Sequence, residues 1–289
     1  THTQSRRQRQ MCIRDRYTRA TAIIWIAAWI MAMSAWLSGM HAILDIFGAL
    51  FVYIVASSYG RIWTLIRRYA EKLANSWREW RFGPVRIINH AFYAGFAGFA
   101  GFLYFAGILG PANLIAALSI CICSLVTAGI WAQVVEGSDK LLRPFGYYGS
   151  VIGAIIGALL VEYWTGLSSF ISLGAMCVAA PLNQGLGRLR CLIQGCCHGA
   201  PAPEDLGIRV SEPNSRVCHL AELRGIPVYP TPLYSIIGNV FIGMVVFRMA
   251  RVGAPGSSII GIYFILSSIA RFVEETYRGE PQTPVLGGL

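Results

Sequence analysis

Eight long apolar runs constrain the fold of this chain more than any other feature. They lie near residues 20–37, 41–57, 91–109, 113–135, 146–163, 168–183, 232–247 and 257–273. A run of about 20 apolar residues crosses the hydrocarbon core of a bilayer as a helix, and in lipid a helix satisfies its own backbone hydrogen bonds. The sequence therefore predicts an all-α fold, a polytopic membrane helical bundle with about eight transmembrane helices.

Composition supports a membrane protein and argues against a nucleic-acid partner. Of 289 residues, 55% are hydrophobic and only 13% are charged, which is too apolar for an ordinary soluble domain. A net charge of +10 would suggest nucleic-acid binding in a soluble protein. Here the basic residues lie mainly between the apolar runs, where the positive-inside rule and anionic lipid head groups account for them.

The chain is predicted to have four segments. Residues 1–19 are polar and basic and are expected to be a disordered or artefactual tail. Residues 20–60 hold the first apolar runs, and residues 61–81 are a basic linker. The linker pattern continues to residue 86 and predicts an amphipathic helix on a membrane surface or a plain cytoplasmic connector. A membrane domain is expected over 82–289, with its C-terminal end cut before one further crossing.

His41 and Asp45 stand between the first apolar runs, four residues apart and thus on one helix face. Spacing alone favours a helix-capping or solvated aspartate over a nucleophile pair. Together with Ser34 they resemble the last motif of the type 2 phosphatidic acid phosphatase family, in which the histidine accepts phosphate and the aspartate orients it. The arginine that follows the family's serine is Ala35 here. Residues 20–60 are therefore interpreted as the remnant of a lipid phosphatase C-terminal end.

The signature stretch, residues 187–199, combines the end of an apolar run with two arginines, three cysteines and a histidine. An arginine at the end of a hydrophobic run is costly unless it meets an anion, a carboxylate or water, so Arg188 is a functional candidate. The glycines of the stretch allow close approach of a ligand. The polar residues 200–230 that follow are predicted to form a small extramembrane cap over the site.

Further arginines stand near the end of the last apolar run. Arg271, Glu275 and Arg278 are spaced four and three residues apart, so one helix face carries all of them. On a surface helix the ordinary interpretation is a solvated salt bridge. At the end of a hydrophobic helix, arginines on both sides of one carboxylate favour an anion site instead.

The eight cysteines form no repeated zinc-binding pairs. The candidate zinc ligands are Cys191, Cys196, Cys197, His198, Cys218 and His219. Because the adjacent Cys196 and Cys197 cannot easily both point to one ion, we predict no metal and no cofactor. A disulfide between Cys218 and one cysteine of the signature stretch stays open.

Four segments carry a resemblance to one family. They are Phe-Gly-Pro-Val-Arg at 82–86, Tyr-Tyr-Gly-Ser-Val-Ile-Gly at 147–153, the signature stretch, and Arg-Phe-Val-Glu-Glu-Thr-Tyr-Arg at 271–278. Residues 82–280 thereby resemble prolipoprotein diacylglyceryl transferase, which moves diacylglycerol from phosphatidylglycerol to the lipobox cysteine of a preprolipoprotein. The resemblance implies a multi-pass enzyme of the bacterial inner membrane. Its implied partners are phosphatidylglycerol or a related anionic phospholipid and a lipobox-containing preprolipoprotein.

The resemblance also assigns site residues. The implied catalytic residues are Tyr148, Arg188, His198, Arg271 and Glu275. The implied phospholipid-binding residues are Arg188, Gln194, Gly199, Tyr234, Arg271 and Arg278. Tyr148 stands where the family has its general-base histidine, and a phenol is a poor base at neutral pH, so we name His198 and Glu275 as substitutes. The alternatives are a catalytically decayed lipid-binding membrane protein and a lipid phosphatase fusion whose phosphatase half is incomplete here.

The orientation of the domain is left open. Four predicted crossings separate residue 82 from the signature stretch, so both are expected on one side of the membrane. The family places its signature outside, whereas the positive-inside rule places residues 61–86 in the cytoplasm.

Overall fold

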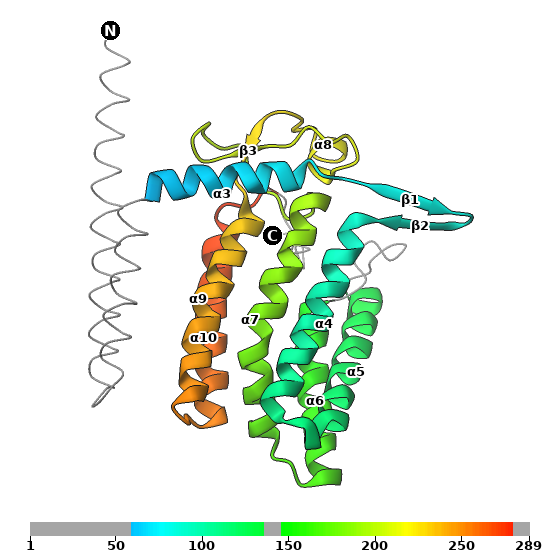
Figure 1. Ribbon diagram of the computed structural model, residues 1–289, viewed down its shortest axis with the longest axis vertical. Coiled ribbons are helices and arrows are strands. Elements are labelled where there is room, and N and C mark those ends of the chain that lie inside the picture. The colour runs from blue at the N-terminus through cyan, green and yellow to red at the C-terminus, as the bar shows by residue number, and fades with distance from the viewer. Residues whose placement is uncertain (1–58, 136–145, 280–289) are drawn as a thin grey trace. The chain divides into compact units, whose positions relative to one another are not determined.

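The computed structural model describes residues 59–135 and 146–279 (Figure 1). The chain divides into two compact units, Thr1–Arg68 and Tyr69–Leu289. Of the first unit only the start of helix α3 (Tyr59–Ala74) is described. The first predicted crossings, with His41 and Asp45, lie outside the described residues, and their interpretation stays a prediction.

Six helices of the described part are long and apolar enough to cross a membrane, and they form the bundle of the second unit. They begin and end within a few residues of the later predicted runs, except that the helix from Ser169 continues to Gln194. The all-α polytopic bundle is therefore confirmed. The helices are α4 (Asn89–Leu109), α5 (Leu114–Ile130), α6 (Tyr147–Thr165), α7 (Ser169–Gln194), α9 (Thr231–Arg251) and α10 (Gly256–Glu275).

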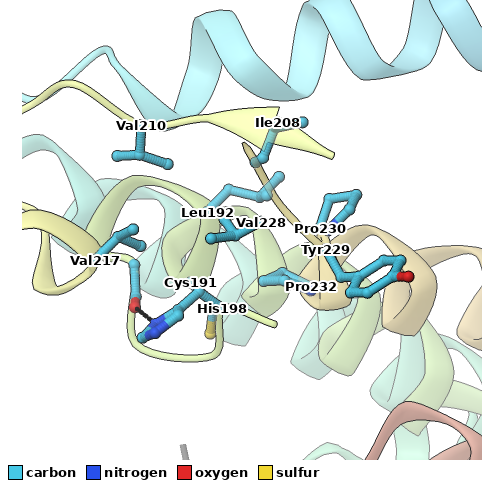
Figure 2. A pocket seen from close by; sticks show the side chains of 11 residues that line it. Cys191, Leu192, His198, Ile208, Val210, Val217, Val228, Tyr229, Pro230 and Pro232 are labelled. Atoms are coloured by element: carbon cyan, nitrogen blue, oxygen red, sulfur yellow. Dashed lines mark hydrogen bonds between the residues drawn. The ribbon is translucent and has the colours of Figure 1, made fainter. Parts of the chain in front are cut away.

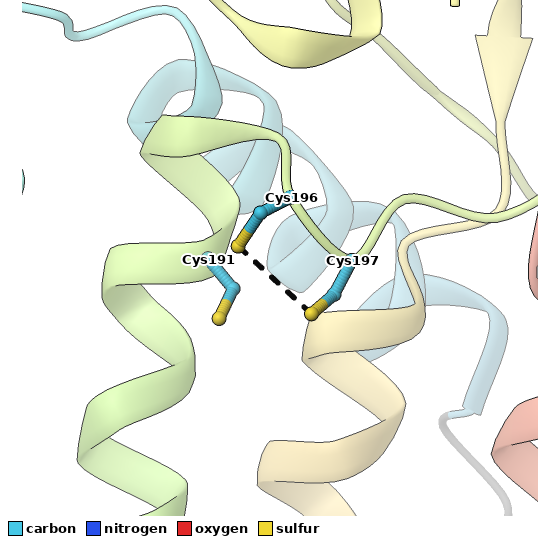
Figure 3. Close-up of side chains that lie close together, drawn as sticks. All are labelled: Cys191, Cys196 and Cys197. Atoms are coloured by element: carbon cyan, nitrogen blue, oxygen red, sulfur yellow. Dashed lines mark hydrogen bonds between the residues drawn. The ribbon is translucent and has the colours of Figure 1, made fainter. Parts of the chain in front are cut away.

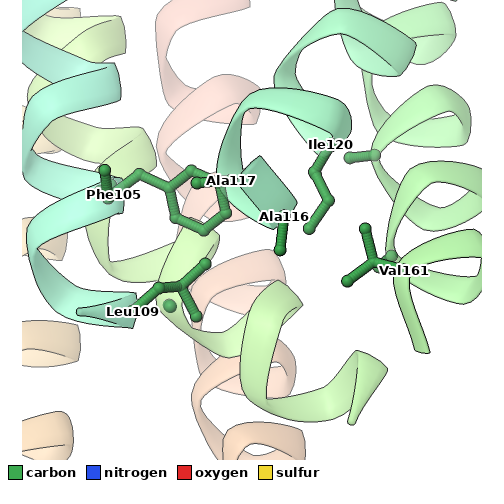
Figure 4. Close-up of a cluster of buried hydrophobic side chains, with 11 residues drawn as sticks. Phe105, Leu109, Ala116, Ala117, Ile120 and Val161 are labelled. Atoms are coloured by element: carbon green, nitrogen blue, oxygen red, sulfur yellow. The ribbon is translucent and has the colours of Figure 1, made fainter. Parts of the chain in front are cut away.

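Small residues let neighbouring helices approach each other closely. A Cβ atom added to Gly153 of α6 would lie 2.4 Å from the carbonyl oxygen of Cys123 in α5. A buried apolar cluster fills the space among α4, α5, α6 and α7, and it includes Phe105, Ile120 and Val161 (Figure 4). Because lipid tails are as apolar as the side chains, this close van der Waals packing is what holds such helices together.

Helix α7 is the central helix of the bundle because it packs against α4, α6, α9 and α10. It ends before Gly195, whose φ of +71° is left-handed and whose amide donates to the carbonyl oxygen of Cys191 over 2.8 Å. The helices alternate in direction. The end of α7 therefore lies at the same end of the bundle as the starts of α4, α6 and α9 and the end of α10 (Figure 1). We call this end the site end.

The segment before the bundle differs from the helix predicted over residues 61–86. Helix α3 ends at Ala74, and an antiparallel hairpin follows, with β1 (Glu79–Phe82) paired to β2 (Val85–Ile88). Its turn contains Gly83 at φ +59° and Pro84, neither of which continues a helix easily. Charged and aromatic residues alternate along β1, which is a strand pattern. The prediction of one continuous helix is wrong beyond Ala74.

Residues 200–230 form the predicted cap, a small irregular unit at the site end between α7 and α9 (Figure 1). It contains β3 (Ile208–Arg209), paired to β4 (Pro227–Val228), and the short helix α8 (Arg216–His219).

Asn75, which follows α3 directly, fastens this part of the chain to the cap. Its Nδ2 donates to the carbonyl oxygen of Arg209 over 2.9 Å, and its Oδ1 accepts from the amide and hydroxyl of Ser211 over 2.8 and 3.0 Å. The end of the linker and the cap thus lie at one end of the bundle. This agrees with the four helices, α4 to α7, that separate them along the chain.

The common placement of linker and cap is testable by thiol labelling in intact cells. Lys72 and Asp205 are exposed at the site end, whereas Ala112, between α4 and α5, is exposed at the opposite end. We expect the cysteines introduced by Lys72→Cys and Asp205→Cys to be either both labelled or both protected when intact cells are treated with a membrane-impermeant maleimide. The cysteine introduced by Ala112→Cys should give the other result. The unmodified chain gives the baseline for native thiols. Labelling of Lys72→Cys and Asp205→Cys from opposite sides would contradict this topology.

Candidate functional site

A buried carboxylate, Glu274, gathers arginine side chains at the site end. Glu274 is the next to last residue of α10 and is only 4% exposed. One of its oxygens, Oε1, lies 2.7 Å from Nη2 of Arg278 and 3.2 Å from Nη1 of Arg271. The other, Oε2, lies 3.9 Å from Nη2 of Arg188, which comes from α7. The carboxylate therefore links the end of α10 to the end of the central helix.

Glu275 completes what we call the arginine cluster, namely Arg188, Arg271, Arg278, Glu274 and Glu275. Its Oε1 pairs with Nη2 of Arg271 and lies 3.5 Å from Nη1 of Arg278. The cluster's three arginines outnumber its two carboxylates, so it carries a surplus of one positive charge.

Exposure differs sharply among the arginines of the cluster. The side chain of Arg278 is 3% exposed, that of Arg188 is 24% exposed and that of Arg271 is 41% exposed. Arg278 is therefore placed to hold Glu274, while Arg188 and Arg271 can reach a ligand. Within the described residues, Nε and Nη1 of Arg278 are buried without a hydrogen-bond partner, so the cluster retains unsatisfied donors.

The structure brings together four residues predicted for the site, Arg188, Arg271, Glu275 and Arg278. Sequence reasoning missed Glu274, the carboxylate that contacts all three arginines. The signal was present, because Glu274 is three residues after Arg271 and four before Arg278, and both spacings place side chains on one helix face.

His198 lies in the loop after α7 and is buried, with 5% of its surface exposed. Its Nδ1 lies 2.9 Å from the carbonyl oxygen of Gly195 (Figure 2). Because a carbonyl can only accept, Nδ1 carries the proton and Nε2 is the ring nitrogen that can take one up. The loop is also tied to α9, since the hydroxyl of Thr231 donates to the carbonyl oxygen of Cys197.

Gly199 is enclosed by protein backbone. Its amide donates to the carbonyl oxygen of Tyr229 over 2.9 Å, and the amide of Ala200 donates to the carbonyl oxygen of Tyr277 over 2.9 Å. A Cβ atom at Gly199 would lie 2.5 Å from Cβ of Tyr229 and 2.6 Å from the oxygen of Tyr277. Close packing of three chain segments thus accounts for this glycine, and its predicted phospholipid contact stays a prediction.

Tyr234 and Gln194 also lie at the site end. Tyr234, in the first turn of α9, packs edge-to-face on Tyr277 with ring centroids 5.6 Å apart. Gln194 is the last residue of α7 and is half-buried. Their roles in phospholipid binding, which the resemblance implies, stay predictions.

Tyr148 lies in the first turn of α6 and is 65% exposed. Its ring packs against Trp131 and Tyr147, with centroids 6.2 and 5.8 Å apart. The alternation of the helices places it at the site end, yet among the described residues no hydrogen bond joins it to the arginine cluster. The catalytic role that the resemblance implies for Tyr148 stays a prediction.

An apolar hollow lies between the cap, the end of α7 and the start of α9 (Figure 2). Its walls include Cys191, His198, Val210, Val217 and Val228. No arginine lines it, but Cys191 and His198 do, so the hollow adjoins the signature stretch that also carries Arg188. The valines belong to the buried core of the cap and explain how such a small unit holds its shape.

The thiols of Cys191, Cys196 and Cys197 converge beside Arg188, and we call them the thiol cluster (Figure 3). Their sulfur atoms all lie within 4.8 Å of one another, and Sγ of Cys196 is 3.9 Å from Sγ of Cys197. The expectation that adjacent cysteines cannot both face one point is therefore wrong, because the loop after Gly195 turns both toward the last turn of α7.

The seven described cysteines are all free thiols, so the disulfide considered for Cys218 is not formed with any described cysteine. Instead its Sγ donates to the carbonyl oxygen of Val210 over 3.4 Å. Nη1 of Arg188 lies 3.5 Å from Sγ of Cys197. Hydrogen bonds from the thiols of Cys191 and then Cys196, together with the charges of nearby arginines, lower the pKa of Cys197.

Replacing Glu274 by Gln tests its role as the counter-ion of buried Arg278. The change leaves a 3% exposed guanidinium without its nearest charge partner, which costs about 3–5 kcal/mol when a buried pair is broken. Glu275→Gln is the matched control. Its ion pair with Arg271 is partly exposed, and an exposed ion pair contributes about 0.2–1 kcal/mol to the free energy of unfolding. Thermal unfolding of both variants in the same detergent should show a large loss of stability for Glu274→Gln only. Equal losses would contradict the assignment.

Gly199→Ala and Gly187→Ala separate two kinds of glycine in the signature stretch. The added methyl group at Gly199 meets backbone and costs about 1–3 kcal/mol, whereas at Gly187 nothing lies within 4 Å of it. Because alanine favours a helix interior over glycine, Gly187→Ala should stabilise by about 0.5–1 kcal/mol. The thermal midpoints of both variants check this, and a stable Gly199→Ala would refute the packing argument.

The chain is similar to known proteins of one family. The profile of the prolipoprotein diacylglyceryl transferase family matches residues 141–289, which begins later than the resemblance predicted from residue 82. A phosphatidylglycerol--prolipoprotein diacylglyceryl transferase 2 of Clostridium perfringens is 28% identical over 159 residues, covering 54% of this chain and 60% of that protein. A phosphatidylglycerol--prolipoprotein diacylglyceryl transferase of Clostridium tetani is 26% identical over 152 residues, which cover 50% of this chain and 57% of that protein.

The chain thus spans no more than 60% of the length of these relatives. The matched part contains α6, α7, the cap, α9 and α10, and hence both the arginine cluster and the thiol cluster. Since the family profile covers more than half of the 289 residues, this chain belongs to the prolipoprotein diacylglyceryl transferase family.

Proposed function

We propose that this chain transfers a diacylglyceryl group from phosphatidylglycerol, or a related anionic phospholipid, to the lipobox cysteine of a preprolipoprotein. The observation that carries the proposal is the arginine cluster at the site end of an apolar bundle. The names of the relatives, which contain both phosphatidylglycerol and prolipoprotein, agree with it.

The charge balance of the arginine cluster favours a phosphate ligand. Three arginines and two carboxylates leave one positive charge without a counter-ion in the cluster. A phosphodiester supplies one negative charge, and guanidinium groups bind phosphate oxygens in pairs. Arg188 and Arg271, whose side chains are 24% and 41% exposed, are the donors for this contact, and buried Arg278 holds Glu274 beside them.

The proposed reaction breaks one bond and forms one. The thiolate sulfur of the acceptor attacks the glycerol carbon that bears the phosphate, and the carbon–oxygen bond breaks. Glycerol 1-phosphate leaves with the electron pair, so negative charge grows where Arg188 and Arg271 stand. Donors that are fixed in advance around such a developing charge are an effective way to lower the barrier.

The acceptor thiol must lose a proton before attack. We assign this task to Nε2 of His198, because its Nδ1 is fixed by the carbonyl of Gly195. Glu275 is less available for this task, since it is already paired with Arg271 and Arg278. Tyr148, exposed at the site end, is assigned to contact with the lipid or the acceptor.

The setting of the reaction follows from the bundle. Six helices with the length and composition of membrane spans bring the arginine cluster to a membrane surface, and the lipid donor resides in the same membrane. We propose the bacterial inner membrane, with Gln194, Gly199 and Tyr234 near the lipid head group. The lipid phosphatase resemblance of residues 20–57 adds no activity to this proposal, because Ala35 replaces that family's arginine.

Turnover of phosphatidylglycerol with a lipobox peptide tests the proposal. Arg271→Ala and Arg188→Ala should each lower the rate about 100- to 1000-fold, the loss expected when a donor to a developing charge is removed. Arg224→Ala, at an exposed arginine of the cap, is the control and should keep the rate. Wild-type protein that is folded and binds phosphatidylglycerol without turnover would overturn the transferase and leave a decayed lipid-binding relative.

His198→Ala and Tyr148→Phe distinguish the proton acceptor. If His198 takes the thiol proton, its alanine variant should lose about 100-fold or more in rate near neutral pH and recover at higher pH, where the free thiol ionises itself. Tyr148→Phe keeps the ring contacts and should retain activity. A rate that depends on the Tyr148 hydroxyl and not on His198 would reverse the assignment.

A further inference from the structure

The thiol cluster has no task in the proposed transfer, although its three sulfur atoms meet at one point. Cys191 comes from the last turn of α7, while Cys196 and Cys197 come from the loop after it (Figure 3). The left-handed Gly195, at φ +71°, reverses the chain between them. The turn brings Cys196 and Cys197 to the side of α7 that carries Cys191. All three Sγ atoms lie within 4.8 Å of one another.

The spacing of the sulfur atoms suits a thiolate complex. With a metal–sulfur bond of about 2.3 Å, two thiolate ligands lie about 3.8 Å apart in a tetrahedron and about 4.0 Å apart in a trigonal plane. Sγ of Cys196 and Sγ of Cys197 are already 3.9 Å apart. The remaining separations are no more than 4.8 Å, so rotation of a side chain is enough to close them.

A positive charge beside the thiol cluster favours such a complex. Three thiolates carry one net negative charge around a divalent ion and two around a monovalent ion, and the neighbouring guanidinium of Arg188 is positive. Nη1 of Arg188 lies 3.5 Å from Sγ of Cys197 and donates to it. Hydrogen bonds of this kind from a second layer of residues orient ligands and strengthen metal binding. Cys197 is 9% exposed, so the site is sheltered from water.

We propose that Cys191, Cys196 and Cys197 bind one thiophilic metal ion with a filled d shell, Zn²⁺ or Cu⁺. Thiolate ligands select these ions over the hard cations that prefer oxygen. The proposal does not depend on the transferase function, because it concerns atoms that the transfer does not use, and metal binding is measured without turnover.

The first test is the metal content of the reduced, detergent-purified full chain after loading with Zn²⁺ or with Cu⁺. We expect about one ion per chain, since three thiolates share one centre. Cys191→Ser, Cys196→Ser and Cys197→Ser should each abolish the bound ion. Cys218→Ser is the matched control, because Cys218 bonds to a cap carbonyl away from the cluster. Competition between the two ions identifies the one that binds more tightly.

The second test uses the unaltered protein, so it holds even if a serine variant does not fold. Cobalt(II) added to the reduced chain should give the sulfur-to-metal charge-transfer band of thiolate ligation. Metal should also protect Cys191, Cys196 and Cys197, but not Cys218, from alkylation followed by mass spectrometry. Reduced protein that binds no ion and alkylates equally with and without metal would overturn the proposal. So would retention of the ion in all three serine variants.

Discussion

Glu274 is a carboxylate almost wholly removed from water, at the point where α7 and α10 end. A carboxylate in that position is stable only if cations compensate it. The chain supplies Arg271 from the same helix, Arg278 from the turn after it and Arg188 from the central helix. The same contact that satisfies Glu274 therefore fixes the arginines in space. The geometry of the ligand-facing guanidinium groups depends on this one buried group.

The backbone around Gly199 holds the same region together from the other side. Amides of Gly199 and Ala200 donate to the carbonyls of Tyr229 and Tyr277, so the signature stretch, the end of the cap and the segment after α10 form one unit. Hydrogen bonds between backbone groups tolerate little displacement. The arginines on α7 and α10 thus cannot separate without breaking the junction that carries the cap, and cap and arginine cluster behave as one structural piece.

Sequence periodicity predicted the parts that depend on one helix at a time. The later apolar runs gave the six described crossings, and the spacing of Arg271 and Glu275 gave their common face of α10. The prediction that Arg278 continues this helix face is wrong, because α10 ends at Glu275. Glu274 was missed because its importance comes from Arg188, which is distant in sequence and arrives only when α7 packs against α10.

The features that depend on a turn were the hardest to predict. The meeting of Cys196 and Cys197 with Cys191 depends on the left-handed backbone of Gly195, and a glycine permits that conformation without requiring it. The hairpin after α3 was missed for a similar reason, since its strands are four residues long and are set by Gly83. Short elements carry too little periodic pattern to compete with a neighbouring helix signal.

Arg188 is the residue in which these arrangements meet. One guanidinium nitrogen faces Glu274 at 3.9 Å and another faces Cys197 at 3.5 Å, so the side chain lies between a carboxylate and a sulfur atom. At such distances, and with little solvent to screen them, charges interact more strongly than they would in water. A change in the charge on the thiols therefore alters the field at the same guanidinium that faces a phosphate. The anion site and the thiol cluster are neighbours that share one cation, and neither can be described by its own residues alone.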